Sequence, residues 1–311
     1  MKYILCLFLL ICIIIQIVYI SQISISSMNY KEQYDSRQRV VYGRNADNLQ
    51  VGYQSFGDVF LNIPVVVTQV DSNNSQKQIY CVNIFNISTR GFYYEKKFMT
   101  EAKLIYNATT ENFHWVAIGE GDPQLSASDS SYHLEYGKIT NDLNRSTINF
   151  KSGWAENPIV LCQILTSGWD RLYTIEVFNV NLTKFEYTKK YVSSPPNTIE
   201  LAATESFYYL AIGKLKTPVS DSTKIKYGII PADNKNYKSS LSFPSAFSNS
   251  SNCAVFGQII CLSPPPYGLY YFQTDGTTNQ MFNYQKSFVS GGIANIRYAT
   301  SESCNWIALG P

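Results

Sequence analysis

The chain is poor in histidine and in charge. Only His114 and His133 occur among its 311 residues, 15% of the residues are Asp, Glu, Lys or Arg, and the formal net charge is +2. A balance so close to neutral offers no basic surface for nucleic acid. Neither histidine lies near a candidate nucleophile, so the sequence provides no Ser–His or Cys–His pair for covalent catalysis. We therefore expect no enzyme and no nucleic-acid partner.

Motifs that hold phosphates or metals are also missing. The Gly-x-x-Ser-x-Gly segment at 52–57 is one residue off the hydrolase pattern, and the glycines at 119–124 open no helical stretch. None of the seven cysteines has Cys-x-x-Cys or Cys/His ligand spacing. We expect neither a cofactor nor a metal site.

The N-terminus differs from the rest of the chain. One lysine precedes an apolar run from Ile4 to Ile20, and a serine-rich tract follows. This pattern predicts a signal peptide at 1–21 or, alternatively, an uncleaved signal-anchor. Residues 22–40 form an N-terminal segment. Six Asn-x-Ser/Thr sequons favour a glycosylated protein that is secreted or held at the cell surface. The candidate asparagines are Asn73, Asn86, Asn107, Asn144, Asn181 and Asn249.

Three tandem repeats follow. Each opens on a Tyr-Gly pair, continues through a strand-like segment with a glutamine in a fixed place, and ends on an apolar segment that closes with glycine. Their boundaries are 41–121, 132–217 and 224–311, and Ser-, Asp- and Pro-containing linkers join them. The closing segments read HWVAIG, YYLAIG and NWIALG, and each repeat also contains Phe-x-Tyr-x-Lys-x-aromatic, at 92–98, 185–191 and 282–288. Repeats of this length predict small domains rather than a solenoid.

Within each repeat, apolar and polar residues alternate with a period of two. In the segments 80–86 and 173–179, one face carries Val and Ile while the other carries polar residues. Such alternation is typical of half-buried antiparallel strands, and no later stretch shows helical periodicity with caps. We predict an all-β fold of three small antiparallel sandwiches with about six strands each.

The segment 62–92, followed by HWVAIG, resembles an H-type lectin domain. The matching residues are Pro64, Val65, Val66, Asp71, Gly91, Phe92, Trp115 and Ile118. The resemblance implies a six-stranded sandwich that assembles as a trimer and binds sugar near the subunit interfaces. For this chain it suggests that the three repeats form a covalent pseudo-trimer.

The family's sugar-binding residues carry over poorly. An arginine that opens one family strand aligns with Ile79, Leu172 and Leu269 here. The best local candidate is the loop GWDRL at 168–172, because Trp169, Asp170 and Arg171 supply a ring, an acceptor and a planar donor. Asp71 is a second candidate. The alternatives are an exposed loop without a ligand and an aspartate that shapes a turn.

Five cysteines follow the N-terminal run. Cys304 is expected to pair with Cys253 or Cys261 inside the third repeat. Cys253 and Cys261 lie too far apart along one strand to bond each other. For Cys81 and Cys162 we expect free thiols or, alternatively, a bridge between the first two repeats.

These features predict a secreted lectin for galactose- or N-acetylgalactosamine-type glycans, with glycans or glycoproteins as partners. Its mechanism is non-covalent, through hydrogen bonds to hydroxyls and stacking on aromatic rings. The alternative is a structural or adhesive extracellular protein whose lectin folds no longer bind sugar. Membrane contact is expected only through an uncleaved N-terminus.

Overall fold

Every regular element that the structure describes is a β-strand. The computed structural model describes residues 38–57, 60–72, 78–100, 105–120, 133–151, 153–166, 171–193, 198–214, 225–232, 238–248, 253–261, 268–290, 296–299 and 301–310. These residues form 21 strands and no helix, as the all-β prediction requires. No helix in this part of the chain could therefore serve as an apolar membrane span. The predicted signal segment and the residues that follow it up to 37 lie outside the described residues.

The strands form three seven-stranded sheets, and each sheet joins strands from two repeats. We name the sheets by those repeats. The 1–3 sheet has the order β1 (Gln38–Asn45), β7 (Asn112–Glu120), β3 (Val65–Asp71), β18 (Gly268–Asp275), β19 (Met281–Ser290), β16 (Lys238–Ser242), with β20 (Ile296–Tyr298) on β19. The 1–2 sheet has the order β2 (Val51–Ser55), β5 (Gly91–Met99), β4 (Ile79–Phe85), β10 (Ile159–Leu165), β14 (Ser206–Gly213), β8 (His133–Ile139), with β6 (Ile105–Asn107) on β5. The 2–3 sheet has the order β13 (Ile199–Leu201), β12 (Lys184–Ser193), β11 (Arg171–Phe178), β17 (Ala254–Cys261), β21 (Ser303–Leu309), β15 (Ile225–Ile230), with β9 (Arg145–Asn149) on β12.

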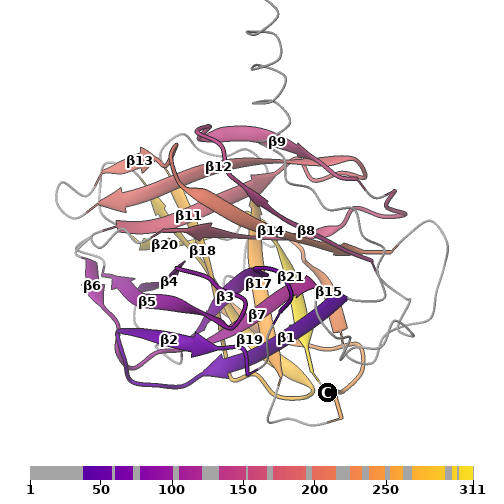
Figure 1. The fold of residues 1–311 in the computed structure, drawn as a ribbon, viewed down its shortest axis with the longest axis horizontal. Helices are drawn as coiled ribbons and strands as arrows, with labels where there is room; N and C mark the ends of the chain where they lie inside the picture. The colour runs from indigo at the N-terminus through magenta and orange to yellow at the C-terminus, as the bar shows by residue number, and fades with distance from the viewer. Residues whose placement is uncertain are drawn as a thin grey trace, which may run out of the picture.

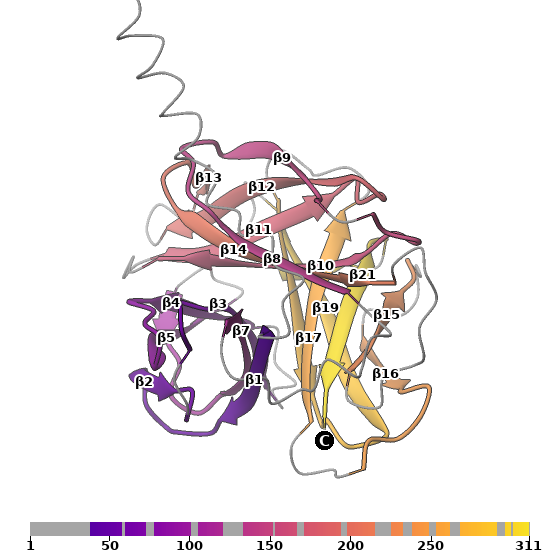
Figure 2. The ribbon, with the colours of Figure 1, turned by 45° about the vertical axis from the view of Figure 1, so that its right-hand side comes forward.

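Each sheet changes repeat at a short parallel seam, whereas the other strand pairs are antiparallel. The seams are Asp71–Thr274 in the 1–3 sheet, Ile84–Leu165 in the 1–2 sheet, and Val177–Ile260 with Phe178–Cys261 in the 2–3 sheet. Repeat one therefore pairs with two, two with three, and three with one. Figure 2 shows the resulting ring, with the indigo, magenta and yellow parts of the chain around a common centre.

The repeated landmarks of the sequence are cross-strand partners. Gly43 of β1 lies opposite Trp115 of β7, and a Cβ at Gly43 would come within 2.9 Å of the Trp115 ring. The corresponding pairs are Gly137–Tyr209 and Gly228–Trp306. The opening glycine is thus needed so that the closing aromatic ring can pack into the repeat's own core. Each of the three repeats has such an apolar core between its two layers of strands.

Two further apolar clusters lie where the three repeats meet. One contains equivalent residues such as Val67, Leu161 and Phe256, and the other is built around Ile79, Leu172 and Leu269. A cavity of about 100 Å³ is lined by residues of all three repeats, among them Cys81, Cys162, Thr68, Thr174 and Tyr271.

Three glutamines close the ring around this cavity. Gln163 Oε1 accepts hydrogen bonds from Thr68 N at 3.2 Å and Thr68 Oγ1 at 2.7 Å, while its Nε2 donates to Val82 O at 3.2 Å. Gln258 and Gln69 repeat this arrangement with the next neighbours. Their partners are Cys162 N and Ile175 O for Gln258, and Gly257 N and Phe272 O for Gln69. Each glutamine therefore bonds two backbone groups of the preceding repeat, because the side chain spans the gap beside the short parallel seam.

The expected disulfide of the third repeat is not formed, since all five described cysteines are free. The register explains this. Cys304 on β21 lies opposite Ile259 on β17, so neither Cys253 nor Cys261 faces it directly. A cysteine displaced by two residues along the neighbouring strand is about 7 Å away, too far for an S–S bond.

Candidate functional site

The predicted loop at 168–172 ends in a cluster of aromatic and charged side chains. Trp169 and Asp170 lie outside the described residues, whereas Arg171 begins β11. Its guanidinium carbon lies 4.3 Å from the centroid of the Tyr191 ring on β12, and Nη1 donates to Tyr173 Oη at 3.4 Å. An arginine stacked in this way is held in one orientation while its other N–H groups remain at the molecular surface.

Two carboxylates flank the arginine. Tyr191 Oη donates to Glu200, and Tyr173 Oη donates to Glu205 Oε1 at 3.2 Å. Glu200 is exposed on β13 and also accepts from Thr198 Oγ1 at 2.9 Å. The hydrogen bond from Tyr191 lowers the pKa of Glu200, so this carboxylate is an anion at neutral pH.

The protonation states of the partners follow from the same contacts. The hydrogen bond to Tyr173 raises the pKa of Arg171, and the bond to Glu200 raises the pKa of Tyr191. The cluster therefore combines one planar cation, two neutral phenols and carboxylate acceptors. These groups can donate to and accept from adjacent hydroxyls on a neutral ligand.

The equivalent positions in the other repeats keep the aromatic pair but lack the arginine, although in repeat three Tyr270 Oη still donates to a carboxylate oxygen, Glu302 Oε1, at 2.8 Å. The ring centroids of Tyr80 and Phe98 are 5.5 Å apart in repeat one, and those of Tyr270 and Phe288 are 4.8 Å apart in repeat three. In repeat one Tyr80 donates to Gln78, the residue that aligns with Arg171. The aromatic pair thus belongs to the fold, and the stacked arginine of repeat two is an addition to it.

Asp71 is not part of this cluster. Its side chain is 9% exposed, its Oδ2 lies 2.7 Å from Arg44 Nη2, and it lies 3.7 Å from His114 Nε2. His114 Nδ1 in turn lies 3.2 Å from Val255 N of repeat three. Burial lowers the pKa of His114. Both ring nitrogens face groups at the seam between repeats one and three, so the Asp71–His114 pair presents no base to a nucleophile.

The positions that align with the family's arginine are buried. Ile79, Leu172 and Leu269 belong to one of the two central clusters, and each is 0% exposed. These positions lie where the three repeats pack together, and a charged side chain there would have to be desolvated. The sugar site implied by the resemblance is therefore not reproduced at these residues.

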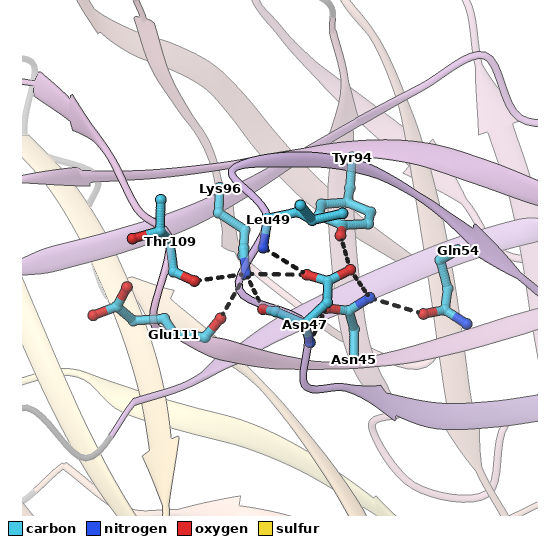
Figure 3. A network of polar contacts seen from close by, with 8 residues as sticks. All are labelled: Asn45, Asp47, Leu49, Gln54, Tyr94, Lys96, Thr109 and Glu111. Carbon is cyan, nitrogen blue, oxygen red and sulfur yellow. Dashed lines mark hydrogen bonds and ion pairs between the residues drawn. The ribbon is translucent and has the colours of Figure 1, made fainter.

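A second polar network holds the loops of repeat one together. Lys96 Nζ donates to Asp47 O at 2.8 Å and to Glu111 O at 3.1 Å, and it also contacts Asp47 Oδ1 at 3.4 Å. Tyr94 Oη donates to the other oxygen of this carboxylate, and Asn45 Nδ2 lies between Asp47 and Gln54, as Figure 3 shows. The Lys96 ammonium, the Asp47 carboxylate and the Tyr94 hydroxyl all have protein partners, so we assign the network to structure.

The lysine of this network recurs in each repeat. Lys96, Lys189 and Lys286 are 0 to 1% exposed. Lysine is seldom buried so completely in a folded protein. The period of two already places each lysine on the same face as the buried Phe and Tyr of its strand, so it points into the sandwich and clamps loop carbonyls.

The described sequon asparagines are accessible. Asn86 and Asn107 are exposed, and Asn144 and Asn181 are half-buried at turns. Asn86 has a left-handed backbone with φ of 46° in the turn between β4 and β5. Asn73 and Asn249 lie outside the described residues.

Sequence reasoning found Arg171 but missed its partners. Tyr191, Glu200 and Glu205 come from β12, β13 and the segment before β14, and only the pairing of those strands brings them together. Tyr191 had a signal, because it ends the repeated Phe-x-Tyr-x-Lys-x-aromatic motif. Among the residues that the structure describes, no group of three or more His, Cys, Asp or Glu could hold a metal ion.

Comparison with known proteins adds no relative. No protein-family model matches the chain, and no curated protein or solved structure matches it.

Proposed function

We propose that this chain is a secreted, glycosylated carbohydrate-binding protein, and that Arg171 is the centre of its sugar site. The observation that carries the proposal is the guanidinium stacked 4.3 Å from the Tyr191 ring beside the exposed carboxylate of Glu200. A sugar of the galactose or N-acetylgalactosamine type offers vicinal hydroxyls, which match a fixed planar donor next to an anionic acceptor. No cofactor or metal takes part.

The proposal includes the architecture of a covalent pseudo-trimer of three lectin-like sandwiches. The cyclic seams and the three glutamines support it, because each repeat completes its sheets with strands of its two neighbours. In a family trimer separate chains would supply those strands. Here the linkers fix the stoichiometry, so the three repeats can diverge from one another.

The test is binding of the Arg171→Ala variant. The wild-type protein should be retained on galactose or N-acetylgalactosamine resin, and a glycan array should then identify the preferred sugar. Loss of charge-assisted hydrogen bonds worth about 1.5–3 kcal/mol should weaken binding roughly 10- to 100-fold.

Arg145→Ala is the matched control. Arg145 stacks 4.9 Å from the Phe178 ring and lies 3.9 Å from Glu186, so it resembles Arg171 in setting but lies outside the cluster. Equal affinity of Arg171→Ala and Arg145→Ala would refute the assignment of the site.

A structural or adhesive role is the second candidate. The observation that favours it is the apolar packing of Ile79, Leu172 and Leu269 where the resemblance implies an arginine. If the wild type bound neither resin and no glycan on the array, the structural or adhesive role would be favoured over sugar binding.

A further inference from the structure

Repeat one has a row of aromatic rings on the outer face of its sheet. Tyr53 of β2 lies directly opposite Tyr93 of β5, with ring centroids 5.1 Å apart. Tyr93 in turn is stacked on Phe85 of β4, with centroids 5.9 Å apart and ring planes 23° apart. These strands lie side by side at the left of Figures 1 and 2. Tyr53 and Tyr93 are 46% and 45% exposed.

Gly91 leaves room for the ring of Tyr53. A Cβ at Gly91 would lie 2.3 Å from the Gln54 backbone O, 2.4 Å from Tyr53 Oη and 2.5 Å from Tyr53 Cζ, so the β2 backbone and the ring both lie close against the bare backbone of β5. Any side chain at this position would clash with the neighbouring strand and with the ring. The residues at the same register in repeats two and three are Lys184 and Met281. The glycine is therefore specific to the repeat that has the row.

The fold does not require these aromatic residues. At the two tyrosine positions, repeat two has Thr147 and Glu186, and repeat three has Ser240 and Asn283. Those residues make ordinary polar contacts, with Ser240 Oγ donating to Asn283 Oδ1 at 2.6 Å. Two repeats thus form the same sheet with polar side chains, and the row in repeat one needs another explanation.

The size and chemistry of the row point to a small polar ligand with a flat apolar face. Two tyrosines at this exposure present roughly 200 Å², whereas a stable protein interface buries about 800 Å² on each partner. In the described part of the chain, no hydrogen bond engages either tyrosine hydroxyl. Sugar rings suit this surface, because they combine an apolar C–H face with hydroxyls at the rim.

We propose that Tyr53, Tyr93 and Phe85 form a stacking platform for the pyranose rings of a glycan chain. The platform is separate from the Arg171 cluster in residues and in mode, since it has no charged donor. It selects for flat, extended chains rather than for one hydroxyl pattern. Neither site depends on the other, and either can be present alone.

The probes are cellohexaose and chitohexaose, whose linked rings expose apolar faces. Titration of the full chain, followed by isothermal calorimetry and tyrosine fluorescence, should show binding of at least one hexasaccharide. The double variant Tyr53→Ser/Tyr93→Ser should weaken it at least about tenfold, because two ring contacts are lost. Leu182→Ser removes an apolar side chain of similar exposure, 42%, and should leave the affinity unchanged. The Tyr53→Ser/Tyr93→Ser variant should keep wild-type retention on galactose resin, which separates this test from that of the proposed function.

Introducing the aromatic row into repeat two provides the converse test. Repeat two already has Phe178 at the position of Phe85. The triple variant Thr147→Tyr/Lys184→Gly/Glu186→Tyr should therefore create a second platform and raise the stoichiometry from one to two. Undiminished binding by a correctly folded Tyr53→Ser/Tyr93→Ser variant, or no binding of either hexasaccharide by the wild type, would overturn the proposal. If the wild type self-associated and the Tyr53→Ser/Tyr93→Ser variant did not, the row would be a contact surface for a second copy of the chain. That result would overturn the proposal as well.

Discussion

Replacing Lys189 by methionine should cost this protein a large part of its stability. The ammonium group of Lys189 is fully buried in repeat two and donates to three backbone carbonyls. The distances are 3.1 Å to Asn141 O, 2.9 Å to Ala203 O and 2.7 Å to Glu205 O. Methionine preserves the length of the stem and removes only the charge, so packing changes little.

The expected loss of unfolding free energy follows from two opposing contributions. Three hydrogen bonds to a charged group contribute roughly 5–9 kcal/mol in total. The burial of the ammonium, which also lowers the pKa of Lys189, opposes this with several kcal/mol. The carbonyls left without a donor are then desolvated without compensation. We expect a loss of about 3–5 kcal/mol, which is large against a typical total of about 5–15 kcal/mol.

Urea denaturation followed by tryptophan fluorescence measures this loss, and Lys184→Met is the matched control. Lys184 lies on the same strand with a side chain 39% exposed and Nζ 3.3 Å from Glu186, so its removal should cost no more than about 0.5 kcal/mol. Because Lys189 holds the backbone of Glu205, its replacement should also loosen one flank of the Arg171 cluster. A loss under about 1 kcal/mol for Lys189→Met would refute the view that these lysines clamp the loops.

Two further predictions concern buried ionisable groups. Burial raises the pKa of Glu176 to about 7 from its ordinary 4.5, although Lys190 Nζ lies 2.7 Å away and opposes the shift. The folded chain therefore binds more protons than the unfolded chain between pH 4.5 and 7, and the free energy of unfolding falls by up to about 3 kcal/mol as pH rises through that window. Wild type measured against Glu176→Gln isolates this slope, and parallel curves would contradict it. Burial also raises the pKa of the Cys81 thiol to about 12, so native alkylation should leave it unlabelled while urea without reductant exposes it. Peptide mapping after alkylation in urea should find Cys304 labelled too. If Cys304 were labelled only after reduction, it would belong to a disulfide, contrary to the structure.

The repeats were predictable because their landmarks are consequences of strand pairing. Gly43 and Trp115 lie at the two ends of a repeat in sequence but opposite each other on β1 and β7. Any repeat that packs its closing ring inward needs a small opening residue, so the pair persists in all three copies. The sharing of sheets between repeats was not predictable from residue patterns, because the parallel seams involve only one or two residue pairs each.

The candidate site was predictable only in its local part. Arg171 stands in a loop whose composition suggests sugar chemistry. Glu200 and Glu205 reach it through strand order, and no sequence pattern encodes their distance from Arg171. The aromatic row was equally hard to predict, because Tyr53, Phe85 and Tyr93 belong to three different strands. In each strand taken alone, the alternation of apolar and polar residues looks ordinary.

The three repeats act as internal controls for one another. Where all three share a feature, such as the buried lysine or the bridging glutamine, the fold accounts for it. Where one repeat departs from the others at a buried position, packing can compensate, as with Cys81, Thr174 and Tyr271 around the central cavity. At an exposed or half-buried position no packing demand explains a departure, because two other copies fold without it. The stacked Arg171 and the Tyr53–Tyr93 pair are both departures of this kind, in different repeats. Because the three repeats belong to one chain, such differences can accumulate in single repeats, whereas in a trimer of identical chains each difference would appear three times.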